Sequence, residues 1–299
     1  MRTIRTWLCV PVAAVVIAAA PAASAYCLTT TCDPNVEDCA EDANGCATQG
    51  LTLSWPVACV SYNLGAESSP NISFEAFTEA AAASFSAWTS LDCGSGQRPS
   101  IQVSDLGAVA SPVTCYNQRN GNSNVVFFQS KSWPYPGSKE TLALTTVTFN
   151  TQTGEIYDAD LEVNSAEATI SVGDVNVEYD LQSIITHEAG HYFGLAHASS
   201  AFKTSTMYPT YAKKSTALRT LEADDAAGMC ALYPVDRKVG ACDPTPRHGF
   251  GTTCGDPPAD DGGGCCNSSV APARPRGTGP LALLSMLGIW AAWRSRRQA

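Results

Sequence analysis

Eleven residues from His187 to His197 place three imidazoles and one carboxylate at spacings that favour a helix ending in a tight turn. Residues four apart lie on one face of an α-helix, so His187 and His191 can direct their rings at one point. Gly194 allows the chain to leave the helix through a left-handed backbone conformation. That turn can bring His197 back toward the other two rings. The segment therefore predicts a helix, a glycine turn and three convergent imidazoles.

Three imidazoles with a fourth position open to water describe a catalytic zinc site rather than a structural one. Glu188 follows the first ligand and can reach a zinc-bound water without ligating the ion. Zinc would lower the pKa of that water and polarise a carbonyl, while Glu188 accepts the proton. Three of the four histidines of the chain stand in this motif, which argues against a chance cluster on an exposed helix. The pattern predicts a zinc peptidase.

The extended motif H-E-x-x-H-x-x-G-x-x-H resembles that of the metzincin peptidases, in which a methionine turn follows downstream. Met207 stands ten residues after His197 and is similar to that methionine turn. Three stretches resemble the matrixin branch of the family: Tyr208–Tyr211, Tyr179–Ile185 and Leu221–Pro234. The resemblance implies an α+β fold, a metzincin-type zincin domain. Such a domain has a twisted mixed sheet, an active-site helix, a Met-turn and a C-terminal helix.

The resemblance also implies roles for individual residues. Met207 would form a hydrophobic floor under the zinc, and Pro209 and Tyr211 would line the pocket for the side chain that follows the scissile bond. Residues 142–149 would form the edge strand above the cleft, with which an extended peptide pairs by strand addition. We expect protein or peptide substrates and a monomeric enzyme.

The metal content is expected to differ from that of animal matrixins, which hold a second, structural zinc with other histidines. The only remaining histidine here is His248, so we expect a single catalytic Zn²⁺. Calcium is a further candidate, because four acids stand near predicted strand ends: Asp158, Asp160, Glu162 and Asp174. No loop has the spacing of a calcium site, which favours the alternative that these acids are simply solvated.

The N-terminus indicates export. Residues 1–25 contain Arg2 and Arg5, an apolar run and a small-residue end, which together predict a signal peptide cleaved before Tyr26. Of the 13 cysteines only Cys9 lies in this segment, and the other twelve fit an oxidising compartment. The net charge of −10 argues against nucleic-acid binding, which favours a basic surface.

Residues 262–299 form a second candidate targeting segment. A glycine run precedes Cys265 and Cys266, and the apolar run Leu281–Trp293 is followed by basic residues. A transmembrane helix needs about 20 apolar residues, so this run is short. The tail resembles the C-terminal sorting tails of myxobacterial surface proteins, which implies processing and lipid attachment at Cys265 or Cys266. The alternative is that the tail stays in place as a weak membrane anchor. Under either interpretation we expect the enzyme at the cell surface, in the outer membrane or outside the cell.

Three parts lie between these ends: a Cys-rich segment and candidate propeptide at 26–50, the catalytic domain at 51–235, and a Pro/Gly/Cys linker at 236–261. Strands are expected at 51–55, 60–62, 101–103, 125–129, 142–149 and 156–163. Ser73 and Asp180 are expected to cap two helices, the first with an apolar stripe from Phe74 to Trp88.

The cysteines suggest several disulfides. The even number in residues 26–50 favours disulfides over a thiolate that blocks the zinc. Two bridges are expected among four cysteines of the domain, Cys59, Cys93, Cys115 and Cys230. Cys242 and Cys254 are expected to close a small loop in the linker.

Two classes of function remain. The first is a zinc endopeptidase with Glu188 as general base. The alternative is a non-catalytic surface binding module that keeps zinc as a staple. Such a staple needs the three histidines but no carboxylate beside the water, so Glu188 favours the enzyme.

Overall fold

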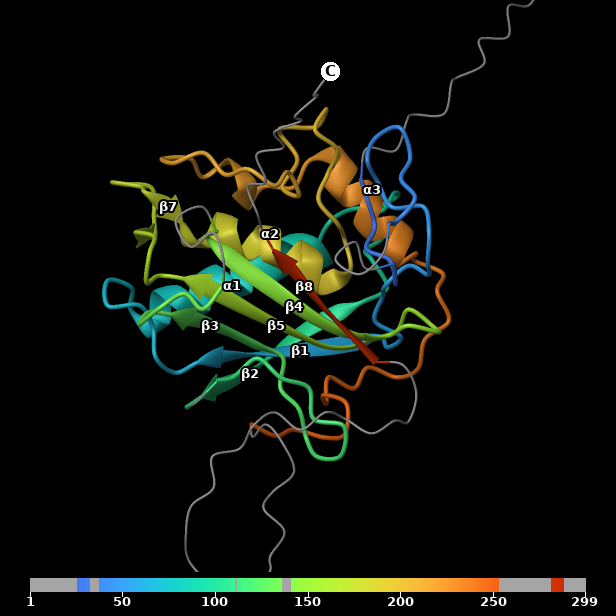
Figure 1. The fold of residues 1–299 in the computed structure, drawn as a ribbon, viewed down its shortest axis with the longest axis horizontal. Coiled ribbons are helices and arrows are strands. Elements are labelled where there is room, and N and C mark those ends of the chain that lie inside the picture. The colour runs from blue at the N-terminus through green and yellow to red at the C-terminus, as the bar shows by residue number, and fades with distance from the viewer. Residues whose placement is uncertain (1–25, 33–37, 111, 136–140, 253–280, 288–299) are drawn as a thin grey trace, which may run out of the picture.

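The computed structural model describes residues 26–32, 38–110, 112–135 and 141–252, together with the backbone of residues 281–287 (Figure 1). The expected signal peptide, Cys254, Cys265 and Cys266 lie outside the described residues. Within the described part of the chain, no helix has the length and apolar character required to span a membrane.

One mixed sheet forms the centre of the fold. It contains β1 (Cys59–Gly65), β2 (Gln102–Val109), β3 (Val125–Gln129), β4 (Ala143–Asn150), β5 (Ile156–Asn164) and β8 (Leu281–Leu287), in the order β2-β1-β3-β5-β4-β8. The first four strands of this order are parallel, whereas β4 runs antiparallel to both β5 and β8. The predicted mixed sheet is confirmed. Residues 51–55 form isolated bridges, such as Thr30 to Thr52, rather than the expected strand.

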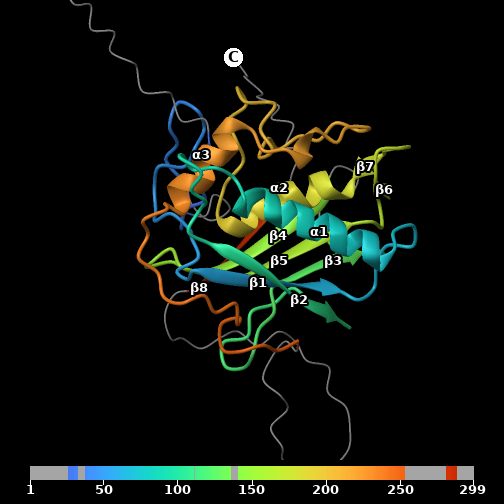
Figure 2. The same cartoon turned by 180° about the vertical axis from the view of Figure 1, so that it is seen from behind.

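Two helices, α1 (Phe74–Thr89) and α2 (Leu181–Phe193), cover the same face of the sheet (Figure 2). The Ser73 side chain accepts a hydrogen bond from the Ala76 amide, and Asp180 accepts one from the Ser183 amide, as expected for N-caps. The predicted apolar stripe of α1 is buried at Phe77, Ala81, Phe85 and Trp88. Its first member is the exception, because Phe74 begins the helix at the surface and is exposed. The Trp88 indole donates to the Thr186 carbonyl at 2.8 Å, which fixes α1 against α2.

Short elements surround α2. The two-stranded sheet of β6 (Ile170–Ser171) and β7 (Tyr179–Asp180) directly precedes it, and the 3₁₀ turn η1 (Ala217–Arg219) and α3 (Ala223–Leu232) follow the site along the chain. The Arg219 guanidinium bonds both oxygens of Asp180, the cap of α2. This ion pair ties η1 to the beginning of α2.

The opposite face of the sheet is covered by residues 112–124 and 242–251. These two segments bridge at Asn122 and Phe250, and the Cys115 amide donates to Asp160 of β5 at 2.8 Å. The Arg237 guanidinium donates to the carbonyls of Trp55 and Val57, which holds the chain after α3 against the domain. Much of the expected linker is therefore packed against the sheet.

The disulfides agree in part with expectation. Cys93 pairs with Cys230, and the N-terminal cysteines form two bridges, Cys27–Cys46 and Cys32–Cys39. The second bridge expected within the domain is wrong, because Cys59 pairs with Cys242. The same bond rules out the expected loop closed by Cys242 and Cys254. The physical reason is the return of the chain over the sheet, which brings residue 242 to the start of β1. Cys115 is also disulfide-bonded.

Candidate metal centre

The second helix and its terminal turn bring three histidines together. His187 and His191 lie one turn apart on α2, with ring centroids 5.0 Å apart. Gly194 ends the helix with φ 104°, a left-handed conformation that glycine adopts without a steric penalty. The chain then turns back, so that the His197 ring lies 4.7 Å from that of His191.

Backbone carbonyls orient two of the rings. His187 Nδ1 lies 2.6 Å from the Thr206 carbonyl, and His191 Nδ1 lies 2.9 Å from the Leu195 carbonyl. Because a carbonyl only accepts, each Nδ1 carries the proton and each Nε2 is left with a lone pair. One nitrogen from each of the three histidines lies within 4.8 Å of the others. Two such lone pairs and a third imidazole nitrogen within this distance suit a zinc ion, which prefers imidazole nitrogen.

Burial keeps the three rings neutral. It lowers the pKa of His187, of His191 and of His197, the last to about 3. The neighbouring histidines lower the pKa of His191 further, because two imidazolium ions would repel each other there. Neutral imidazole is the form that ligates a metal, so the centre suits a cation.

Glu188 lies on the same helix and faces β4. Its side chain is buried, and burial raises its pKa to about 8. The Thr145 hydroxyl donates a 2.6 Å hydrogen bond to Glu188 Oε2. Sequence reasoning missed Thr145, because nothing distinguishes one threonine in a threonine-rich strand. The contact holds the carboxylate of the residue that follows His187 against β4.

Met207 packs against α2 at Gly190. A Cβ atom placed on Gly190 would lie 2.1 Å from Met207 Sδ, so the helix and the methionine touch only because residue 190 is glycine. Asp225 of α3 holds this segment by accepting from the Ser205 hydroxyl at 2.5 Å and the Thr206 amide at 2.8 Å. The carbonyl of the same Thr206 lies against His187 Nδ1, so α3 is linked to the first of the three histidines.

The two residues expected in a specificity pocket lie after Met207. Pro209 is half-buried, and Tyr211 connects its loop to the start of α2. The Tyr211 hydroxyl accepts from the Asp180 amide at 3.1 Å and donates to the Ser215 carbonyl. This pair of hydrogen bonds limits how far the tyrosine can move.

The four acids considered for calcium do not form a common site. Among the described residues, the three histidines are the only group of three or more that could share a metal ion. The expectation that the acids are solvated is wrong for Asp158, Asp160 and Glu162, each only 1% exposed. The segment that contains Cys115 covers Asp160, and the Tyr135 hydroxyl and the Gln129 amide donate to the Glu162 carboxylate. Asp174 is exposed and pairs with Arg219.

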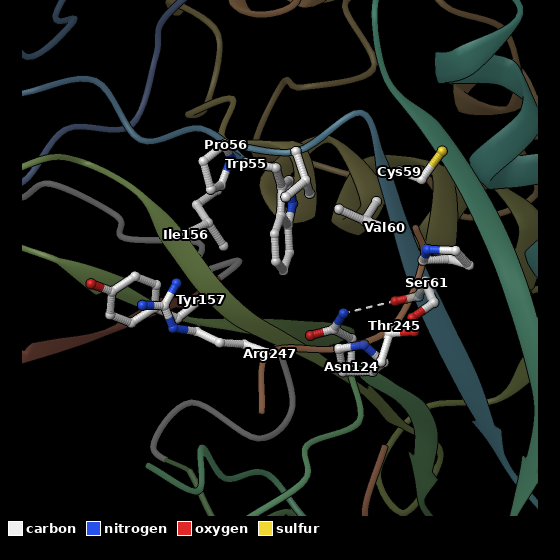
Figure 3. A pocket seen from close by; sticks show the side chains of 13 residues that line it. Trp55, Pro56, Cys59, Val60, Ser61, Asn124, Ile156, Tyr157, Thr245 and Arg247 are labelled. Atoms are coloured by element: carbon white, nitrogen blue, oxygen red, sulfur yellow. Dashed lines mark hydrogen bonds between the residues drawn. The ribbon is translucent and has the colours of Figure 1, made fainter. Parts of the chain in front are cut away.

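A cavity of about 140 Å³ lies where residues 244–247 cover the sheet (Figure 3). Asn124 borders it and donates a 2.7 Å hydrogen bond to the Ser61 carbonyl. The Arg247 guanidinium lies 3.9 Å above the Tyr157 ring. Of the described residues, those that line this cavity include neither the three histidines nor Glu188, so it is separate from the metal centre.

Comparison with known proteins shows which family the sequence around these residues resembles. The family model for matrixin matches residues 112–234, which contain β4, α2, all three histidines and Met207. This match and the relatives described next support a matrixin-like zinc metalloendopeptidase.

Individual relatives point to the same class of protein as the family model. Neutrophil collagenase of Homo sapiens is 31% identical over 134 residues, which are 43% of this chain and 27% of the collagenase. Metalloendoproteinase 1-MMP of Arabidopsis thaliana is 35% identical over 83 residues, 26% of this chain and 22% of the relative. Matrix metalloproteinase-20 of Homo sapiens is 35% identical over 118 residues, 39% of this chain and 22% of the relative. The chain thus spans about a quarter of the length of these relatives.

Proposed function

We propose that this protein is a zinc-dependent endopeptidase that hydrolyses peptide bonds in protein substrates. One observation carries the proposal. Ligand atoms of the three histidines converge on one point, and the next residue after the first of them, the buried Glu188, has its carboxylate held by a hydrogen bond from Thr145 of β4. A metal that served only as a staple would need the imidazoles but no oriented carboxylate.

The roles of the residues follow from their positions. His187, His191 and His197 would hold the zinc, each as a neutral ligand. When bound, zinc lowers the pKa of a water molecule and polarises a carbonyl. Glu188 accepts the proton of the attacking water and delivers it to the leaving amine. Thr145 keeps the carboxylate oriented during both transfers.

Substrate recognition is proposed to combine strand addition with a side-chain pocket. An extended peptide would pair with the outer edge of β4, whose backbone passes over Glu188. Pro209 and Tyr211 would line the pocket for the residue after the scissile bond. The tethered Tyr211 hydroxyl favours a pocket of fixed depth.

We place the enzyme outside the cytoplasm. The disulfides of the domain are consistent with export, because such bonds form and persist in oxidising compartments. Removal of residues 1–25 and processing of the tail at Cys265 or Cys266 are part of this proposal. Mass spectrometry of the protein from its native host would test both ends, since it would report the first residue and any lipid on either cysteine.

Cleavage of a mixed peptide library tests the activity. We expect the parent protein to cut peptides and Glu188→Ala to lose this activity while it still binds one zinc per chain. Glu79→Ala, which changes an exposed glutamate of α1, is the matched control and should cut normally. If parent and variant both bind zinc and neither cuts, the zinc-stapled binding module replaces the enzyme.

A further inference from the structure

A strand from the C-terminal tail adds to the edge of β4. β8 runs antiparallel to β4 through seven consecutive register pairs, from Leu144 with Leu287 to Asn150 with Leu281. It lies on the side of β4 opposite β5, and Figure 1 shows it in red along that strand. The tail therefore occupies the edge that would otherwise be open to a peptide.

The register places β8 at the metal centre. Thr145, whose hydroxyl bonds the Glu188 carboxylate, is the register partner of Met286. Its neighbour Leu144 is the partner of Leu287. The C-terminal end of β8 thus lies level with the catalytic carboxylate, where the backbone of a bound substrate would have to pass.

We propose that residues 281–287 act as a tethered inhibitor that occupies the substrate edge of the enzyme. The inference rests on the proposed peptidase function. Each outward amide and carbonyl of β4 can pair with only one added strand, so β8 and a substrate exclude each other.

The covalent connection of β8 to the domain and its uncharged sequence both favour β8 over a free substrate at the edge of β4. A segment on the same chain competes at an effective concentration in the millimolar range, above that of most free substrates. The 28 residues between Thr252 and Leu281 could reach about 90 Å when extended, which is ample for a connection across the domain. The segment Leu-Ala-Leu-Leu-Ser-Met-Leu carries no charge that would oppose its addition to the edge.

The proposal gives the tail a second role. A cut between residues 252 and 281, such as processing at Cys265 or Cys266, would disconnect β8 from the domain. The loss of the tether would then allow substrate to replace it. Activity would rise when the tail is processed.

Two neighbouring proline substitutions in the full-length zinc-loaded protein test this. In an antiparallel strand, successive amides point to opposite sides, so only one of Leu283→Pro and Leu284→Pro removes an N–H that faces β4. We expect that one variant to cut a fluorogenic peptide about tenfold faster at limiting substrate, because its internal competitor is weakened. The other proline variant serves as the matched control and should stay near the parent.

Hydrogen exchange of the β4 amides provides a readout that does not depend on activity. The outward amides of β4 should exchange faster in the activated variant than in the parent. Equal protection in all three proteins would overturn the inference. Suppose instead that the parent is active and that the outward β4 amides of one variant exchange faster than those of the parent. If that variant then cuts the peptide no faster than the parent, the inhibitory role is overturned. If no variant cuts although zinc is bound, the proposed function fails, and the exchange data alone decide whether β8 occupies the edge.

Discussion

The hydroxyl of Thr145 donates a hydrogen bond to Glu188, and its contribution to the proposed reaction can be measured. Thr145→Val removes the donor to Glu188 while it keeps the shape and the backbone of β4. A hydrogen bond to a charged group contributes about 1.5–3 kcal/mol, so kcat should fall about 10-fold to 100-fold with little change in KM. Steady-state kinetics and zinc content check this. Thr145→Ser keeps the hydroxyl and should restore the rate. A valine variant as fast as the parent would contradict the orienting role.

Two buried acids on the outer face of the sheet should make stability depend on pH. Burial raises the pKa of Asp158 and of Asp160, and the two carboxyl groups share a hydrogen bond. The folded state therefore keeps a proton that the unfolded chain loses above the ordinary aspartate pKa of 3.8. Stability falls as pH rises from that value to about 8, the raised pKa of Asp160.

Asp158→Asn should flatten this decline, because an amide resembles the protonated acid and does not titrate. We expect the free energy of unfolding of the parent to drop relative to the variant between pH 5 and pH 8, by up to about 1.4 kcal/mol per pH unit for one retained proton. Urea titrations at several pH values measure the difference. Asp160→Asn should instead destabilise at every pH, since Asp160 accepts from two backbone amides. Parallel pH profiles for parent and Asp158→Asn would rule out the shared proton.

The contacts and burial of some single residues could be predicted from the sequence, and those of others could not. The histidines and Glu188 were predictable because helical spacing and one glycine turn bring them together locally. Thr145 was not, since its contact with Glu188 joins two elements 43 residues apart. The burial of Asp158 and Asp160 was missed because the covering segments come from distant parts of the chain.

At the scale of elements, the packing of α2 on Met207 depends on Gly190. Gly190→Ala would place its Cβ 2.1 Å from Met207 Sδ and 2.9 Å from the Trp88 ring. Overpacking of this kind costs about 1–3 kcal/mol, and the displaced helix should also lose activity. Denaturant unfolding of zinc-loaded protein measures the cost. Gly240→Ala, with nothing within 4 Å of the added atom, is the control and should unfold like the parent. Unchanged stability in Gly190→Ala would show that Met207 can move aside freely.

Helices and strands were predicted better than their connections. Periodic apolar residues and the caps Ser73 and Asp180 were sufficient for α1 and α2. Residues 51–55 alternate like a strand, but their backbone groups bond several segments, including Thr29 and Gly154, rather than one neighbouring strand. The Cys59–Cys242 bridge could not be predicted, because disulfide pairing depends on the three-dimensional path.

At the scale of the whole molecule, the metal should stabilise the fold as well as the reaction. The ligands come from α2 and from the segment after it, so an ion that binds only the folded chain shifts unfolding by mass action. Chelation should abolish cleavage and lower the free energy of unfolding by about 3 kcal/mol or more, and added Zn²⁺ should restore both. Calorimetry with and without chelator checks this. His191→Ala should behave like the chelated protein, whereas His248→Ala should respond to chelator like the parent. An unfolding midpoint that chelator leaves unchanged would contradict a metal held by this triad.

The N-terminal segment around Cys27 and Thr29 contacts the turn that carries His197, so assembly of the metal centre depends on this segment. The Thr29 amide donates to the Gly194 carbonyl and the Ala196 amide donates to the Cys27 carbonyl, so the turn before His197 is held by this segment. Cys27 is itself joined to Cys46, a bond that forms in oxidising compartments. We therefore expect tighter zinc binding by the oxidised chain than by the reduced one, which titration of zinc with and without reductant would show. A peptidase built in this way would remain harmless to the cell that synthesises it until the chain has been exported and oxidised.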